Sequence, residues 1–575
     1  MKKPSKPAGD YVTIDITELN ELRQQIVEVA CHTAGSAHVT AVGLIDTYPT
    51  HTENGKSVLE AVVVIKDFQP RLLSYFRTIN GRNVFFFAVD QWVFERDIDR
   101  GFLGEAIASK LIFPYISLQG DCYLHGQELL LKKRLILESI ANLSIGYPEL
   151  VYHMQIKPQF FLYDVLLKRV RVFPLLAYEM TNMLEGSTLK DEEKALKSYN
   201  DALMQLAVDG LISRVNGYVT VSKEFALQSR NPKVWLTNLS KNAPRTLFTS
   251  FFGVFPQLLN IIAQDTQAFI RTQKINLHLL QTDINPNCYT IDPQKYVFVP
   301  TSEGLVSLAD KVNISGFTKK MFINEKPESV TFEAIGGVLN DIYLIKAQVN
   351  GVERKVLVKR FKDWSGFKWF PLTLWSFGAR AFAVSGKARL AKECATSEFL
   401  RLRGFNVPKI LFVSNPERLV FMDFIEGEDL SHSIKRLALD QKNKDSIELV
   451  NIEVTGELFA KVHSHGMTLG DTKPENVMIG KDGTVYLLDF EQATQDGDKA
   501  WDIAEFLYYS GHYLQPLQNN QTAEDITKAF IKGYLHGGGD LKDVKKAESA
   551  KYTRVFSVFT MPSTILAIAN TIRKA

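Results

Sequence analysis

The residues with the clearest chemical potential lie in two short segments of the C-terminal part of the chain. One is Gly-Asp-Thr-Lys-Pro-Glu-Asn at Gly470 to Asn476, and the other is Asp489-Phe490-Glu491, which follows a short apolar strand. Asp471 can accept a proton from a hydroxyl nucleophile, and Lys473 can neutralise charge on a γ-phosphoryl group. Asn476 and Asp489 offer the oxygen ligands that Mg²⁺ or Mn²⁺ prefers. This combination predicts phosphoryl transfer from ATP.

The elements that must position these groups lie upstream in a consistent order. Phe332 to Ala347 predicts a strand, a glycine turn and a second strand, in which Gly336 and Gly337 let backbone amides approach phosphates. The alternating strand from Lys355 to Phe361 presents Lys359, which is suited to the α- and β-phosphates of ATP. The order of these elements matches the order in which a nucleotide site would need them.

The helix predicted from Lys387 to Leu402 carries two acidic residues, Glu393 and Glu398, that could pair with Lys359. We predict that Glu393 forms the pair, because its distance from the following Gly-Phe-Asn-Val-Pro turn suits this arrangement. A strand beginning at Leu419 then enters a predicted hinge, where backbone groups of Asp423, Phe424 and Ile425 are expected to bind adenine. A further helix is expected from Leu430 onward.

Two other features near the loop are predicted to be structural. A helix begins at Ala500, and its Asp502 is expected to bond backbone amides of the loop that carries Asp471. His463 and His465 precede that loop, and no neighbouring residues complete a set of metal ligands. We therefore expect neither histidine to bind metal.

From Ala334 to about Phe506, roughly a third of the chain, these motifs resemble the protein-kinase-like superfamily. The resemblance is to its atypical branch, which includes the archaeal KEOPS-complex kinase, Rio kinases, lipopolysaccharide-core (Kdo and heptose) kinases and aminoglycoside phosphotransferases. It implies a two-lobed fold that binds ATP and a divalent ion. The metal and loop motifs are specific, whereas paired glycines in a hairpin are common in unrelated proteins.

Three residues depart from the family pattern. Leu469 stands where these branches usually have histidine, and Gly470 stands where regulated protein kinases have arginine. Glu491 replaces the glycine after Asp-Phe, as in aminoglycoside and sugar kinases, and it either assists a metal or points to solvent. Lys473 favours serine/threonine protein kinases instead, so the residues leave the acceptor open.

The whole chain is too long for a single hydrophobic core. Its 575 residues are 45% hydrophobic and 23% charged, with a net charge of +3, which is ordinary for a soluble globular protein and gives no global preference for nucleic acid or membrane. The helices and strands expected along the chain predict a multidomain α+β fold. The four cysteines form no close pair, which fits a reducing, cytoplasmic compartment. The expected divisions are a disordered tail (1–10), an α/β domain (11–148), a helical domain (149–228), a connecting region (229–320), a kinase-like N-lobe (321–425) and a kinase-like C-lobe (426–575).

In the front part, helical spacing predicts helices at Glu18 to Cys31, Gly101 to Phe113 and Glu128 to Leu143, and apolar runs predict strands at Val39 to Ile45, Leu59 to Ile65 and Asn83 to Val89. The pair of strands from Val39 to Ile65 resembles a degenerate nucleotidyltransferase core. Asp46-Thr47 stands at its turn, and Glu60 and Asp90 are the only carboxylates near the strands where that family binds metal. The expected metal pair is therefore lost.

The next segment resembles a winged helix. An amphipathic helix from Tyr199 to Asp209 precedes two short β-runs that turn at Asn216-Gly217. A winged helix would bind either nucleic acid or a protein partner, and the alternative is a plain helical linker that ends in a hairpin.

An aromatic insertion separates Lys359 from Glu393. It holds three of the six tryptophans, Trp364, Trp369 and Trp375, interleaved with basic residues. These side chains either pack against the front domains of the chain or form a peripheral membrane contact.

Three functions follow from these patterns. The leading one is an ATP- and Mg²⁺-dependent atypical serine/threonine protein kinase. The alternatives are a small-molecule or sugar kinase, and an ATPase or nucleotide-gated scaffold in an RNA or DNA complex. The acceptor is either a protein or a small molecule.

Overall fold

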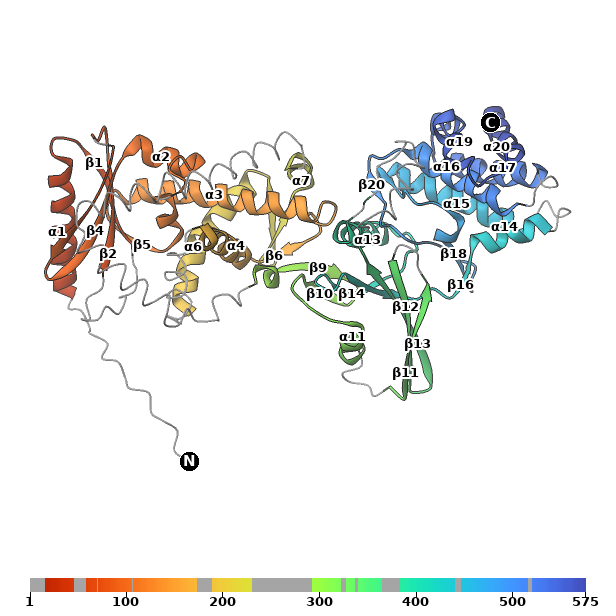
Figure 1. Cartoon of the computed structure of the whole chain (residues 1–575), viewed down its shortest axis with the longest axis horizontal. Helices are drawn as coiled ribbons and strands as arrows, with labels where there is room; N and C mark the ends of the chain where they lie inside the picture. The colour runs from red at the N-terminus through yellow and green to blue at the C-terminus, as the bar shows by residue number, and fades with distance from the viewer. Residues whose placement is uncertain are drawn as a thin grey trace. The chain divides into compact units, whose positions relative to one another are not determined.

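The computed structural model describes residues 16–45, 58–69, 71–105, 107–172, 189–229, 292–321, 327–336, 340–363, 383, 385–439, 446–514 and 520–575. The chain divides into two compact units (Figure 1), an N-terminal unit of residues 1–142 and 157–293 and a C-terminal unit of residues 143–156 and 294–575. Both contain helices and sheets, so the described chain is a mixed α+β protein. The finer division into six segments stays a prediction.

The N-terminal unit is built on a five-stranded sheet with the order β3-β4-β2-β1-β5. Its strands are β1 (Val39–Ile45), β2 (Val58–Ile65), β3 (Leu72–Ile79), β4 (Arg82–Asp90) and β5 (Tyr115–Gln119). In β2 the successive residues Val62, Val63 and Val64 are all buried, because both faces of the sheet are covered. Helices α1 (Ile16–Ala34) and α2 (Gln91–Arg100) lie on opposite sides of the sheet (Figure 1).

The predicted strands β1, β2 and β4 and the predicted helix α1 are confirmed, but the helix predicted from Gly101 to Phe113 is wrong. Gly101 adopts φ +63° and ends α2, and only a short 3-10 helix, η1 (Ala108–Ile112), follows it. The buried Asp97 carboxylate accepts hydrogen bonds from the backbone N–H groups of Leu103 and Ala108, at 2.7 and 2.9 Å. These amides therefore bond a side chain instead of a helical turn.

Helices follow the sheet, as predicted. They are α3 (Asp121–Gly146), α4 (Pro158–Val172), α6 (Leu189–Val208) and α7 (Lys223–Ser229). The Asn-Gly hairpin is confirmed: β7 (Ile212–Val215) pairs antiparallel with β8 (Tyr218–Val221), and Asn216 and Gly217 adopt φ +51° and +79°. The winged-helix assignment and its partners stay predictions.

The two carboxylates considered for a nucleotidyltransferase metal site lie at different places on the sheet. Glu60 on β2 forms an ion pair with Lys110 at 2.6 Å, whereas Asp90 caps α2 and accepts from the Phe68 N–H at 2.9 Å. In the parallel β2–β4 pair, Asp90 is opposite Ile65, five positions beyond Glu60, which is roughly 16 Å along the strands. They are too far apart to share one ion.

The C-terminal unit has a sheet subdomain, residues 327–425, around an antiparallel sheet with the order β11-β12-β13-β15-β14. The strands are β11 (Ser329–Gly336), β12 (Asn340–Val349), β13 (Val352–Phe361), β14 (Ile410–Ser414) and β15 (Leu419–Asp423). Helix α13 (Gly386–Arg401) connects β13 to β14. All but β14 match strands expected from the sequence, and α13 matches the helix expected from Lys387.

A segment before this sheet covers one of its faces. Strand β9 (Val297–Thr301) pairs with both β6 (Gln155–Ile156) and β10 (Gly304–Ser307). The Ser302 N–H that follows β9 donates to the Ile410 carbonyl of β14 at 2.9 Å. Helix α11 (Ile314–Met321) places Phe317 flat against Phe421, with ring centroids 4.0 Å apart. The sequence did not predict this helix, which is only eight residues long.

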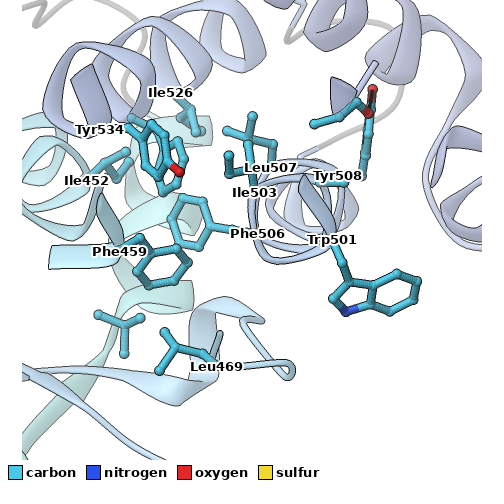
Figure 2. Packing of buried hydrophobic residues seen from close by; sticks show 14 of the residues in the cluster. Ile452, Phe459, Leu469, Trp501, Ile503, Phe506, Leu507, Tyr508, Ile526 and Tyr534 are labelled. Atoms are coloured by element: carbon cyan, nitrogen blue, oxygen red, sulfur yellow. Dashed lines mark hydrogen bonds between the residues drawn. The ribbon is translucent and has the colours of Figure 1, made fainter. Parts of the chain in front are cut away.

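The helical subdomain, residues 426–575, surrounds one large apolar core. Its helices are α14 (Leu430–Leu439), α15 (Ile447–Ser464), α16 (Lys499–Ser510), α17 (Asn520–His536), α18 (Leu541–Lys546), α19 (Ala550–Phe556) and α20 (Pro562–Lys574). Figure 2 shows Phe459 of α15 beside Phe506 of α16, with ring centroids 5.6 Å apart, and Leu469 on the same core. A Cβ on Gly456 would lie 2.2 Å from the Phe530 carbonyl oxygen, so α15 and α17 need glycine there to pack closely.

Short strands hold the motif loops between these helices. Strand β17 (Met467–Thr468) pairs with β20 (Thr494–Gln495), and β18 (Val477–Gly480) pairs with both β16 (Gly427–Asp429) and β19 (Val485–Leu487). The loop from Gly470 to Asn476 therefore leaves β17 and enters β18, ending in the 3-10 turn η5 (Pro474–Asn476).

Several predicted features lie outside the described residues: Gly337, Asp46-Thr47, the insertion with Trp364, Trp369 and Trp375, the tail 1–10 and residues 230–291 of the connecting region. None of the helices in the described part of the chain combines the length and apolarity needed to cross a bilayer.

Candidate active site

Lys359 lies at the centre of the candidate site. Its ammonium nitrogen, Nζ, is 2.6 Å from Asp489 Oδ1, 3.1 Å from Glu491 Oε2 and 3.3 Å from Glu393 Oε2. The Lys359 residue is 5% exposed, so this cation and its acidic partners interact with little screening by water. The pair of Lys359 with Glu393 is formed as the sequence indicated, whereas Glu398 instead bonds Arg401 of its own helix at 2.8 Å.

Local structure explains how the lysine reaches these carboxylates. Side chains alternate across strand β13, so the buried Val358 and the buried Lys359 point to opposite faces of the sheet. Val358 joins the apolar cluster that contains Phe317, and Lys359 meets Glu393 of α13. Glu393 also accepts a hydrogen bond from the Phe490 N–H at 3.0 Å, which connects α13 to the segment containing Asp489.

The charges in this cluster shift one another's pKa values. Burial would lower the pKa of Lys359, but the carboxylates of Asp489, Glu393 and Glu491 outweigh burial and hold this pKa well above its ordinary value. Burial, with added repulsion from Asp489 and Glu491, raises the pKa of Glu393 to about 7 despite the neighbouring lysine. Lys359 is therefore charged at neutral pH.

The loop from Gly470 to Asn476 brings three predicted groups together. Lys473 Nζ lies 3.1 Å from Asp471 Oδ2, and Asn476 Nδ2 donates to the Asp471 carbonyl oxygen at 2.8 Å. The Asp471 carboxylate is the main cause that raises the pKa of Lys473, against the effect of burial, and Asp489 adds to it. A hydroxyl that reached Asp471 would therefore meet an acceptor carboxylate and a fixed positive charge side by side.

Asp502 supports the base of this loop. This fully buried carboxylate accepts from the N–H groups of Leu469 and Gly470, at 2.6 and 2.9 Å, and contacts His463 Nε2 at 3.1 Å. The predicted bonds from Asp502 to the loop amides are confirmed. Gly470 adopts φ +82°, a conformation that would strain the arginine found there in regulated protein kinases.

A second buried carboxylate, which the sequence reasoning missed, acts beside Asp502. Glu505 Oε2 accepts from the Thr472 N–H at 2.8 Å, from the Thr472 hydroxyl at 3.1 Å and from the Trp501 indole at 3.2 Å. Both carboxylates lie on α16, three residues apart and thus on one helical face. The three-residue spacing from Asp502 could have predicted from the sequence that Glu505 also supports the loop.

The residues proposed as metal ligands have suitable chemistry for Mg²⁺. Asn476 uses Nδ2 for the bond to Asp471, so its carbonyl oxygen faces the other way. Asp489 adopts φ +60°, which is uncommon for a residue with a side chain and occurs often at functional turns. Burial would raise the pKa of Asp489, but Lys359 outweighs burial and lowers it, so the carboxylate is ionised.

One amide and one carboxylate are a fitting protein contribution to a Mg²⁺ site that phosphates complete, since Mg²⁺ keeps few protein ligands. Within the residues described, no group of three or more His, Cys, Asp or Glu side chains is arranged to hold a metal. The binding of Mg²⁺ by Asn476 and Asp489 stays a prediction.

The residues predicted to contact adenine and phosphate lie at the ends of two strands of the sheet subdomain. The Asp423 N–H donates to the Lys409 carbonyl at 3.0 Å, so this donor is already engaged within the protein. Phe424 and Ile425 follow directly after β15 ends at Asp423. Gly336 ends β11 with φ +120°, a conformation that favours glycine. Their roles in binding ATP stay predictions.

Glu491 does not point to solvent, which corrects one of the two roles considered for it. This residue is 4% exposed, and its carboxylate contacts Lys359, Arg389 and Asn340. Arg389 and Asn340 were missed by the sequence reasoning, because their contacts join residues far apart in the chain. The one sequence signal for a buried charge here was Arg389, which stands between Ala388 and Leu390 in α13.

No protein-family model matches the chain. The KEOPS complex subunit Bud32 of Pyrococcus abyssi is 27% identical over 159 residues, covering 27% of this chain and 67% of that protein. A probable serine/threonine-protein kinase PknB of Lactococcus lactis is 30% identical over 102 residues, covering 18% of this chain. The serine/threonine-protein kinase PknD of Protochlamydia amoebophila is 32% identical over 95 residues, covering 15% of this chain.

The chain spans only 16% of the PknB protein and 9% of the PknD protein. All three similarities are distant and involve a minority of the present chain. Together with the site geometry, the kinases among these relatives support a kinship of the matching part with the protein-kinase-like superfamily.

Proposed function

We propose that the C-terminal unit is an ATP- and Mg²⁺-dependent phosphotransferase that acts as a serine/threonine protein kinase. The observation that carries the proposal is the joint presence of two sets of groups. One set is Lys359, bonded to both Glu393 and Asp489, and the other is Asp471, Lys473 and Asn476 on a single loop. These are the groups that hold the phosphates of ATP and orient a hydroxyl nucleophile.

In the proposed reaction, the hydroxyl oxygen of the acceptor forms a bond to the γ-phosphorus. The bond from that phosphorus to the β–γ bridging oxygen breaks, and ADP leaves with the electron pair. The hydroxyl proton passes to the Asp471 carboxylate, while Lys473 balances charge on the transferred group. Mg²⁺, bound through Asn476 and Asp489, would supply neutralisation of the phosphate charges.

The assignment to serine/threonine acceptors rests on Lys473 and on the names of two relatives, PknB and PknD. A second candidate, ATP hydrolysis within an RNA or DNA complex, is favoured by the similarity to the KEOPS subunit. The sugar-kinase alternative was suggested by Glu491 and Gly470. The Glu491 carboxylate is engaged by Arg389 inside the protein and so gives no information on the acceptor, which leaves Gly470 as the basis of this alternative.

The test measures ³²P transfer from γ-labelled ATP to the chain itself and to mixed serine/threonine peptides, together with ADP formation. Asp471→Asn should reduce transfer by about 100-fold or more while ATP binding persists. Asp540→Asn is a matched control, because Asp540 is an exposed helix cap and asparagine caps equally well. Equal transfer by wild type and Asp471→Asn would refute the proposal, and ADP formation without any acceptor, increased by added RNA or DNA, would favour the second candidate.

A further inference from the structure

We infer that Asn340, Arg389 and Glu491 form a buried triad that holds three segments of the site in the arrangement Lys359 needs. The three are positioning residues, since they act through Lys359 and the segments on which they lie. The inference deepens the proposed function and rests on it for its catalytic consequence, although the mechanical part can be measured without activity.

The triad is closed by hydrogen bonds between all three members. Arg389 Nη1 donates to Asn340 Oδ1 at 2.7 Å and to Glu491 Oε1 at 3.1 Å. Asn340 Nδ2 donates to the other carboxylate oxygen, Glu491 Oε2, at 2.7 Å. Each member therefore contacts both others, and none can move alone without breaking two contacts.

Each member comes from a different segment. Asn340 is the first residue of β12, and Arg389 lies in the first turn of α13. Glu491 follows Asp489 and Phe490 in the loop after β19. A second guanidinium nitrogen of Arg389 donates to the Lys362 carbonyl just beyond β13. The triad thus connects strand β12, helix α13 with Glu393, the segment with Asp489 and the end of strand β13, which carries Lys359.

Burial makes this arrangement specific. Arg389 is 0% exposed, Glu491 4% and Asn340 7%, so the ion pair has lost nearly all contact with water. Removing water from two charges is costly, and a buried ion pair often adds little net stability compared with apolar side chains. Any other position of α13 would leave a buried charge unpaired, which costs several kcal/mol. The pair therefore selects one arrangement rather than adding stability.

The triad reaches the reacting centre through Glu491. Its Oε2, which accepts from Asn340, also lies 3.1 Å from Lys359 Nζ. Glu491 is thus the third carboxylate that contacts the Lys359 ammonium, beside Asp489 and Glu393. The arginine fork and the carboxylate together fix both the helix and the lysine.

Hydrogen exchange in the absence of nucleotide tests the mechanical part. The variants are Arg389→Met, Glu491→Gln and the double substitution. The control is Arg401→Met, which removes an arginine of the same helix whose partner, Glu398, lies on that helix too. Amides of α13 and the Phe490 amide should exchange about tenfold faster or more in each single variant, and the double variant should resemble the worse single one. Arg401→Met should leave them unchanged.

Activity then tests the catalytic part with full-length protein. Both single variants should lower kcat and raise the KM for ATP, each by about tenfold, whereas a general loss of folded protein would lower kcat alone. Unchanged protection in both variants would overturn the triad, whatever the activity. A wild-type chain that neither binds ATP nor transfers phosphate would overturn the proposed function while the exchange result still decides on the triad. Glu491→Gln keeps shape and size, so it carries the test if Arg389→Met does not fold.

Discussion

Asp502→Asn is the perturbation whose effect can be derived most directly from the structure. The wild-type carboxylate accepts from two backbone amides through different oxygens, Leu469 N–H to Oδ2 and Gly470 N–H to Oδ1. Asparagine has the same shape but only one acceptor oxygen, so one of the two amides must face an NH₂ group. The substitution therefore removes a hydrogen bond without creating a cavity.

The free-energy cost of Asp502→Asn has two parts, the lost hydrogen bond and the weakening of the one that remains. Leaving one buried N–H without an acceptor costs about 1–3 kcal/mol, and the remaining bond weakens by roughly 1 kcal/mol because its acceptor is no longer charged. The sum is about 2–4 kcal/mol, or roughly 30- to 700-fold in the local opening equilibrium at 1.4 kcal/mol per factor of ten. The loop that carries Asp471 should open more often by this factor.

Hydrogen exchange measured by NMR or by mass spectrometry of short peptides reports on these two amides directly. The Leu469 and Gly470 amides should lose protection by roughly 30-fold or more in Asp502→Asn. Amides of α17 in the same subdomain should keep their protection, because Asp502 reaches that helix only indirectly, through His463 and Tyr534. Asp540→Asn should leave the loop unchanged.

The result that would refute this reasoning is unaltered exchange at both amides in a folded Asp502→Asn protein. That outcome would mean that the two hydrogen bonds do not hold the loop. Loss of protection throughout the subdomain would instead show that Asp502 supports the whole helical core, so the local interpretation would be wrong as well.

Three further substitutions give independent tests. Gly456→Ala should destabilise the helical subdomain by several kcal/mol in urea unfolding, because the new Cβ would meet the backbone of α17, whereas Gly126→Ala, with open space around it, should be neutral or stabilising by up to about 1 kcal/mol. Phe317→Ala should cost about 3 kcal/mol and speed hydrogen exchange in α11; unchanged exchange there would contradict the packing seen against the sheet. At Asp498, burial would raise the pKa, but bonds from one tyrosine and two lysines outweigh burial and lower this pKa to about 2. The carboxylate thus stabilises the fold by about 1 kcal/mol after allowance for solvent screening, fully above about pH 4 and less as pH falls toward 2. Asp498→Asn should remove this increment at pH 7, and a difference from wild type that persists unchanged below pH 2 would contradict the assignment.

Much of the candidate site could be predicted because its groups are arranged locally. The loop from Asp471 to Asn476 is one short segment, and the order strand, helix, loop identified Lys359 and Glu393. The choice between Glu393 and Glu398 was also accessible, since five positions on a helix separate their directions by more than a quarter turn. Residues near each other in sequence can be judged by spacing alone.

The remaining contacts depend on tertiary structure. Arg389 meets Asn340 and Glu491 across 49 and 102 positions of sequence, and no periodicity connects residues at such separations. Likewise, the segment after Gly101 has helical apolar spacing, yet Asp97 captures its amides and prevents a helix. In both cases a buried polar group satisfied by distant or irregular backbone partners decides the structure, and hydrophobic pattern does not report it.

The discontinuous make-up of the C-terminal unit affects how the chain can fold during synthesis. Residues 143–156 leave the ribosome first, but the rest of this unit starts only at residue 294. Tyr147, for example, accepts a hydrogen bond from Asn415 at 3.0 Å and lies 4.1 Å below the Lys387 ammonium. At a synthesis rate of about 5–20 residues per second, the early segment waits on the order of ten seconds or more. Until Lys387 and Asn415 have been synthesised, Tyr147 cannot form these two contacts, so a slowed ribosome should increase aggregation of the nascent chain more than it would for a chain of contiguous domains.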